Sequence, residues 1–276
     1  MKKISFFIII IIFLLCDVAF SEELSSPSLS DYEYGSYRTL MKDTGEFLWK
    51  AEWVLNKEIT ESRGGIRENV KTVRIKETGY GKYKNAKNPI SWNVESTFTL
   101  ENPPKVLKTI RTAITKDGIE IWRKSKIFDY SGKRLLAQEY VSGELVKSKV
   151  LNIPEGSTFP TDILPILLRG YNFNSKQPAK FHIFSTDGKL YKINTKIVNV
   201  EEITVPAGSF RCYKLELILD MGLLNKIVGY FLPKTFMWFT VNTPHTWIKY
   251  EGLESGLNSP YVVMELADFK DKKEYK

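Results

Sequence analysis

Alternation of apolar residues with a period of two is the feature that most limits how this chain can fold. From residue 47 onward every second residue is apolar, namely Phe47, Trp49, Ala51, Trp53 and Leu55. This is the period of a strand with one buried face, whereas a helix would scatter the same side chains around its axis. The pattern therefore predicts a mainly β protein.

Dipeptides typical of tight turns separate the alternating segments. They are Asp117-Gly118, Ser131-Gly132, Ser142-Gly143 and Asp187-Gly188. Such dipeptides close β-hairpins and fix the pairing register. The first three predict four consecutive antiparallel strands. The fourth predicts that His182 lies opposite Ile193 and Phe184 opposite Tyr191, all on one face.

The segment VPAG at residues 205–208 predicts another hairpin, with a three-residue loop and a bulge, between strands at 197–204 and 209–219. It has too few glycines, and no following helix, to bind phosphate. Its role is to reverse the chain.

One segment, residues 160–170, favours a helix. Thr161 or Asp162 is expected to cap its N-terminus, Pro165 fits the first turn and Gly170 ends it. The segment is apolar on most sides, so we expect it to lie against the sheet.

The N-terminus has the pattern of a secretory signal peptide, with Lys2 and Lys3 before an apolar run that is too short to span a membrane. We expect residues 1–21 to be the signal peptide, 22–31 a flexible polar leader, and 32–276 a single β-rich domain. The protein would then be exported, to the periplasm, with no transmembrane segment in the mature chain. A second interpretation makes Cys16 a lipid anchor, although Leu15 stands where a small residue is usual.

Composition restricts the classes of partner. Without the signal peptide, Cys212 is the one remaining cysteine, so no intramolecular disulfide is expected and stability must come from a core. The formal net charge of +8 is spread along the chain, which suits an anionic envelope surface. Nucleic acid is not expected as a partner of an exported protein.

No catalytic or metal-binding motif is apparent. His182 and His245 have no Cys, Asp or Glu at ligand spacing, so we predict no metal, no cofactor and no catalytic residues. Cys212 lies in an alternating strand and is interpreted as a packing residue. His182 is either a ligand contact or, as we favour, a satisfied, partly buried histidine.

Several blocks of sequence resemble, in order, an exported bacterial family known as domain of unknown function 3108. These blocks are residues 44–53, 161–169, 203–210, 237–240 and 262–266. The resemblance implies a large, strongly curved antiparallel sheet, a half-barrel similar to that of lipoprotein carriers, with one short helix on its concave side. Those carriers hold acyl chains between sheet and helix, and the likeness implies no enzymatic activity.

An apolar cleft between sheet and helix is the site that these features predict. The six tryptophans fill the core of a curved sheet, but some could line a groove that one short helix leaves open. The residues expected at this cleft are Phe47, Trp49, Trp53, Ile163, Leu167, Leu168 and His182.

Three functions follow from these expectations. The first is a non-enzymatic envelope protein that binds or shuttles a lipid or other apolar, acyl-chain ligand. The second is an interaction or scaffold module that binds an envelope protein partner and has a filled core. The third, an enzyme acting on an envelope polymer, has the least support because no acid, base or nucleophile set can be assembled.

Overall fold

The structure, a computed structural model, describes residues 24–61, 69–82, 88–175, 177–185, 188–220, 233–256 and 259–271. Residues 1–21, where the sequence predicts a signal peptide that contains Cys16, lie outside the described residues. Within the described ranges no helix is long and apolar enough to cross a membrane.

Fifteen strands are present in the described residues, and all belong to one sheet. They are β1 (Tyr32–Met41), β2 (Phe47–Glu61), β3 (Asn69–Gly81), β4 (Ile90–Thr99), β5 (Val106–Ile114), β6 (Glu120–Asp129), β7 (Arg134–Val141), β8 (Glu144–Asn152), β9 (Thr158–Pro160), β10 (Lys180–Phe184), β11 (Leu190–Val205), β12 (Gly208–Leu219), β13 (Thr235–Thr240), β14 (Trp247–Leu253) and β15 (Tyr261–Asp271). The mainly β prediction is confirmed.

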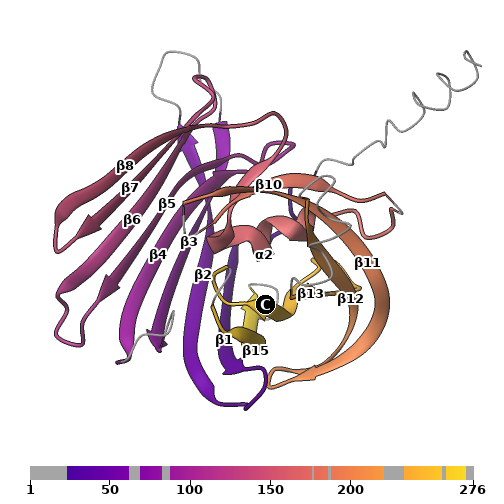
Figure 1. The fold of residues 1–276 in the computed structure, drawn as a ribbon. Coiled ribbons are helices and arrows are strands. Elements are labelled where there is room, and N and C mark those ends of the chain that lie inside the picture. The colour runs from indigo at the N-terminus through magenta and orange to yellow at the C-terminus, as the bar shows by residue number, and fades with distance from the viewer. Residues whose placement is uncertain are drawn as a thin grey trace, which may run out of the picture.

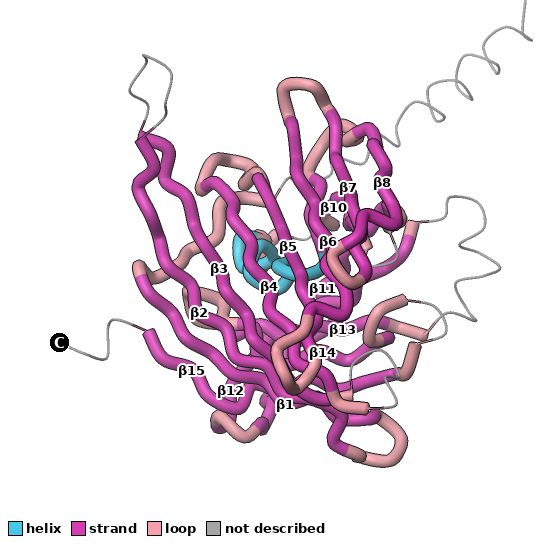
Figure 2. Tube along the Cα trace, turned by 90° about the vertical axis from the view of Figure 1, so that its left-hand side faces the viewer, coloured by secondary structure: helices cyan, strands magenta, loops and turns pink. Residues whose placement is uncertain are grey.

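The sheet has two halves that meet at the pairing of β1 with β15. Strands β1 to β8 form one antiparallel meander, and strands β15 to β9 follow in reverse chain order on the other side of β1. Every neighbouring pair is antiparallel except β9 and β10, which are parallel. The sheet curves strongly around the short helix α2 (Figure 1), so the prediction of one large curved sheet with a helix on its concave side is confirmed. Figure 2 shows the same helix from the side, enclosed by strands.

Two tryptophans lie over glycines on the neighbouring strand. Trp53 of β2 is paired with Gly35 of β1, and Trp92 of β4 is paired with Gly79 of β3. A Cβ added at Gly35 would meet the Trp53 indole at 2.6 Å, and one at Gly79 would collide with Trp92. Each glycine therefore leaves the space in which a large ring lies flat on the concave face.

The helical segment consists of η1 (Thr161–Ile163), α2 (Leu164–Leu167) and η2 (Leu168–Gly170). Its position and its end at Gly170 match the prediction. The expected side-chain cap is wrong: residue Pro160 is the N-cap without a side-chain hydrogen bond, because the Asp162 carboxylate binds Arg111 and Lys126 instead.

The register at the 185–189 turn corrects one expectation about His182. Ser185 donates its backbone N–H to Lys189, so Phe184 pairs with Leu190 and His182 with Lys192. The loop is one residue longer than a two-residue hairpin, and a shift of one residue moves a side chain to the other face. Conversely, the 205–208 hairpin is tighter than expected, since Val205 pairs directly with Gly208.

The polar leader is packed against the domain where the structure describes it. Leu24 and Leu29 are buried, and Ser25 donates its backbone N–H to the carbonyl of Gly170. The serine content of residues 22–31 predicts a flexible leader, and this remains a prediction. The buried leucines show that part of the segment contacts the core cluster that contains the helix.

Candidate functional site

A cavity of about 440 Å³ lies between the helical segment and the concave face of the sheet. Strands of both halves contribute, from β1 to β5 and from β10 to β15. We call it the sheet–helix cavity. Its apolar lining includes Tyr37, Trp49, Ala51, Trp92, Leu164, Pro165, Ile183, Tyr191, Ile193, Leu217, Leu219, Met237, Trp247, Tyr250, Leu253 and Met264. Its volume and apolar character fall in the range of small-molecule binding sites.

Of the seven residues expected at the cleft, Trp49 lines the cavity. Trp53, Ile163, Leu167 and Leu168 are buried in the main core, behind the cavity wall. Phe47 is 51% exposed and His182 is partly exposed on the opposite face of β10, and neither belongs to the lining. The apolar side chains by which the helical segment lines the cavity are therefore Leu164 and Pro165, and not the expected Ile163, Leu167 and Leu168.

Four charged side chains form a cluster where the helix meets the sheet. The Asp162 carboxylate accepts hydrogen bonds from Arg111 Nε at 3.0 Å and Lys126 Nζ at 2.7 Å. Arg111 also lies 3.6 Å from Glu77. Burial alone would raise the pKa of Asp162, but the positive charges of Lys126 and Arg111 outweigh it and hold that pKa well below its usual range. The cluster fixes the start of the helix to β5 and β6.

The pKa of Glu77 is shifted in the opposite direction to that of Asp162. Burial raises its pKa, and neither the Arg111 charge nor the hydrogen bond from Trp92 cancels this effect. Its side chain nevertheless keeps 23% of its surface accessible, and Glu77 belongs to the cavity lining. The Glu77 side chain is therefore largely enclosed by protein and still contributes to the cavity wall.

Two indole N–H groups hold carboxylates beside the cavity. Trp92 donates to Glu77 at 3.0 Å and Trp49 donates to Glu254 at 2.7 Å. The two tryptophans pack edge to face, with ring centroids 5.4 Å apart. This pair therefore places two carboxylates close to one aromatic surface.

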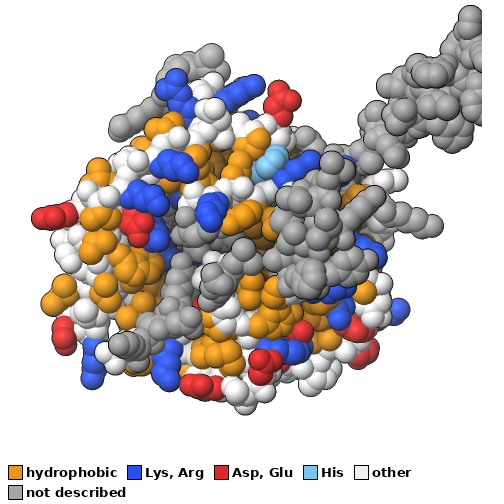
Figure 3. Space-filling model, viewed as in Figure 1, with side chains coloured by type: hydrophobic (Ala, Val, Ile, Leu, Met, Phe, Trp, Pro, Cys, Tyr) orange, Lys and Arg blue, Asp and Glu red, His pale blue; other side chains and the backbone are white. Residues whose placement is uncertain are grey.

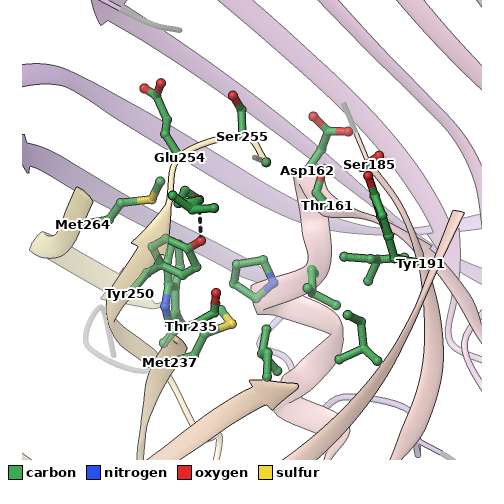
Figure 4. Close-up of a pocket in the computed structure, with 18 of the residues that line it drawn as sticks. Thr161, Asp162, Ser185, Tyr191, Thr235, Met237, Tyr250, Glu254, Ser255 and Met264 are labelled. Atoms are coloured by element: carbon green, nitrogen blue, oxygen red, sulfur yellow. Dashed lines mark hydrogen bonds between the residues drawn. The ribbon is translucent and has the colours of Figure 1, made fainter. Parts of the chain in front are cut away.

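Polar side chains gather along one side of the cavity. In Figure 4 the side chains of Glu254, Ser255, Asp162, Thr161 and Ser185 lie along this side, with Met264 near Glu254, and Met237 lies toward the other side next to Thr235. The Thr161 hydroxyl oxygen is buried without a hydrogen-bond partner. Such a lining suits a molecule with one polar and one apolar end.

The described residues offer neither a metal-binding group nor an activated cysteine at this site. In the described residues no three His, Cys, Asp or Glu side chains are grouped so as to hold a metal ion. Cys212 is buried in β12, and burial, together with the charges of Glu201 and Glu202, raises the pKa of its thiol to about 12. Its thiol is therefore not activated as a nucleophile.

Sequence reasoning missed the charged members of the cavity, although a signal for them exists. Glu77 continues the inward-facing series of Val73 and Ile75, and Arg111 lies between the inward-facing Thr109 and Ala113. A charged residue at an inward position of an alternating strand indicates a buried polar site.

The solved structures to which this chain is similar include two bacterial proteins. One is a predicted exported protein with a YmcC-like fold from Bacteroides fragilis, 9% identical, with a TM-score of 0.32 over 91% of this chain and 100% of that chain. The other is a predicted lipoprotein from Parabacteroides distasonis, 11% identical, with a TM-score of 0.36 and the same coverage. At these scores the likeness carries no conclusion about this chain.

No protein-family model matches the sequence, and neither does any curated protein. Membership of the family of domain of unknown function 3108 thus remains a prediction. Fold and site together define a class: a β protein whose single open sheet curls around one short helix and leaves an aromatic cavity between them.

Proposed function

We propose that this chain is an exported cell-envelope protein that binds or carries an apolar, acyl-chain ligand in the sheet–helix cavity and catalyses no reaction. The observation that carries the proposal is the cavity itself, which the helix and sheet do not fill. Natural cores are packed to high density, so a space of about 440 Å³ lined by aromatic and aliphatic side chains is unusual unless something occupies it.

Affinity would come from burial of the acyl chain. Each CH₂ group that moves from water to the cavity contributes about 0.8 kcal/mol, which is roughly a fourfold change in Kd. The methionines Met237 and Met264 suit such a ligand, because their flexible thioethers adapt to irregular apolar surfaces.

The test is isothermal titration calorimetry of residues 22–276 with fatty alcohols of increasing length, together with native mass spectrometry of the purified protein. We expect affinity to rise with each CH₂ until the cavity is full. Ile183→Trp should fill the cavity and abolish binding, because Ile183 lines it and is only partly buried. Val198→Trp, at an exposed position of β11, is the matched control.

A folded protein that binds no member of the series would refute the proposal. Equal binding by the wild type and the Ile183→Trp variant would show that any ligand lies elsewhere. Thermal unfolding of both tryptophan variants checks that each is folded.

A second candidate function is an interaction module, and strand β8 favours it. This strand ends the sheet, and Leu145, Val146 and Val150 are more than half exposed. An unpaired edge of this kind can accept a further strand from a partner. Cross-linking of the protein in its native envelope, with a photoreactive residue at Ser148, would show whether a protein lies there.

A further inference from the structure

The charges that line the sheet–helix cavity are mainly negative. The described lining contains the acidic residues Glu77, Asp162, Glu216 and Glu254, and the basic residues Arg111 and Lys234. Lys126, behind the lining, adds one positive charge next to Asp162. Among the described residues, acidic side chains at the cavity outnumber basic ones, and carboxylates in an enclosed site of low dielectric favour a ligand of opposite sign.

Arg111 is poorly placed to bind an anionic ligand. Its Nε donates to Asp162 at 3.0 Å, and a second nitrogen faces Glu77 at 3.6 Å. An anion approaching this guanidinium group would lie beside both carboxylates. The cluster therefore repels a fatty-acid carboxylate more than it attracts it.

The aromatic lining favours a cation. Six aromatic side chains surround the cavity, namely Tyr37, Trp49, Trp92, Tyr191, Trp247 and Tyr250. Aromatic faces attract ammonium groups, and tryptophan does so most strongly. The Trp49–Trp92 pair also carries Glu254 and Glu77 on its indole N–H groups, so aromatic surface and negative charge coincide.

We propose that the ligand is an amphiphile with a cationic ammonium head group, an inference that rests on the function proposed above. Glu77 and Glu254 bind the head group at the Trp49–Trp92 pair, and the chain extends toward Met237. The polar side chains that gather along one side of the cavity in Figure 4 suit the head group of such a molecule, and the apolar remainder of the lining suits its chain. Glu77 lines the cavity and its side chain is partly accessible, so it can supply a counter-charge to the head group.

The test compares decyltrimethylammonium, decan-1-ol and decanoate, each below its critical micelle or solubility limit, by isothermal titration calorimetry. The alkyl chains of decyltrimethylammonium and decan-1-ol are equal, and that of decanoate is one carbon shorter, which accounts for about fourfold in Kd and is allowed for in the comparison. We expect decyltrimethylammonium to bind about tenfold more tightly than decan-1-ol, and decanoate to bind most weakly.

Glu77→Gln and Glu254→Gln should each lower the preference for decyltrimethylammonium over decan-1-ol about fivefold. Glutamine keeps the oxygen that accepts the indole N–H, so the site retains its shape. Glu52→Gln, at an exposed position of β2, is the control.

Equal binding of the three head groups, or a preference for decanoate, would overturn this inference and leave the proposed function standing. Binding of none of the three would overturn both. A loss of decan-1-ol binding in the two glutamine variants would show that the carboxylates only shape the cavity.

Discussion

At the scale of single residues, Arg169 and Glu33 form a completely buried ion pair that the sequence did not indicate. Two guanidinium nitrogens contact the Glu33 carboxylate, at 2.6 and 3.1 Å. Arg169 also donates to the carbonyl oxygens of Pro244 and Ser28. One side chain at the end of the helix therefore joins the leader, β1 and the loop before β14.

Arg169→Met should reduce the free energy of unfolding by about 3–5 kcal/mol, because it leaves Glu33 buried without its partner. Urea unfolding followed by circular dichroism measures the change. Arg38→Met is the matched control: Arg38 is 46% exposed in its pair with Glu265, and surface pairs contribute about 0–1 kcal/mol. A similar loss in both variants would contradict the special role of the buried pair.

Glu77→Gln should stabilise the protein at neutral and higher pH. Burial raises the folded-state pKa of Glu77, so the folded protein holds this proton more tightly than the unfolded chain does. The stability that protonated Glu77 contributes is complete below the unfolded pKa of about 4.3 and is lost as pH rises through the folded pKa. Glutamine resembles the protonated form at every pH.

The difference in Tm between Glu77→Gln and the wild type should therefore be small near pH 4 and grow toward pH 8. Thermal unfolding across this range measures it, with Glu52→Gln as the exposed control. A Tm difference that does not change with pH would show that Glu77 titrates alike in the folded and unfolded states.

At the scale of elements, the two edges of the sheet differ in their protection. β9 has three residues, all buried, and it contacts β5. β8 has nine residues and is exposed along most of its length. Hydrophobic side chains are visible at the left of Figure 3, where Figure 1 places β6 to β8. Lys147 and Lys149 lie in the middle of β8, and edge lysines discourage strand-to-strand association.

The double substitution Lys147→Thr and Lys149→Thr should promote dimers. Antiparallel pairing of two β8 strands about Ser148 would place Leu145 opposite Leu151 of the second copy and each lysine opposite the other lysine. Removing the like charges takes away the repulsion and leaves the apolar pairs. Size-exclusion chromatography with light scattering measures the mass.

Lys116→Thr with Lys108→Thr, two exposed lysines away from the edge strand, is the control for the change in net charge. If the variant with both β8 lysines replaced stays monomeric at high protein concentration, other features of β8 prevent pairing.

At the scale of the whole molecule, the helical segment holds two parts of the sheet together. Asp162 at its start binds Arg111 of β5 and Lys126 of β6. Arg169 at its end binds Glu33 of β1. The cavity exists because these anchored ends hold the helix above the sheet surface while Leu164 and Pro165 face the open space.

Asp162→Asn should loosen the helix without unfolding the sheet, because Arg111 and Lys126 lose their shared counter-charge while Arg169 still holds the other end. Hydrogen exchange followed by mass spectrometry should show faster exchange in residues 161–170 and in β5 and β6. Asp268→Asn, which alters a half-exposed ion pair with Lys270 on β15, is the control. If the rate of amide hydrogen exchange in residues 161–170 is unchanged, apolar packing alone holds the helix in place.

The mainly β class, several of the strands, the positions of most turns and the helix at residues 160–170 could be predicted from the sequence, as could the expectation of export, because each depends on neighbouring residues and on a local period. The sequence also placed Trp49 on an inward face. Long-range contacts set the pairing of β1 with β15. They also place Trp53, Leu167 and Leu168 in the core, and Trp49, Glu77 and Glu254 at the cavity. The physical reason is that period two assigns each side chain to a face but not to a depth. Depth depends on how far the sheet curves, and that is set by contacts between residues far apart in the chain.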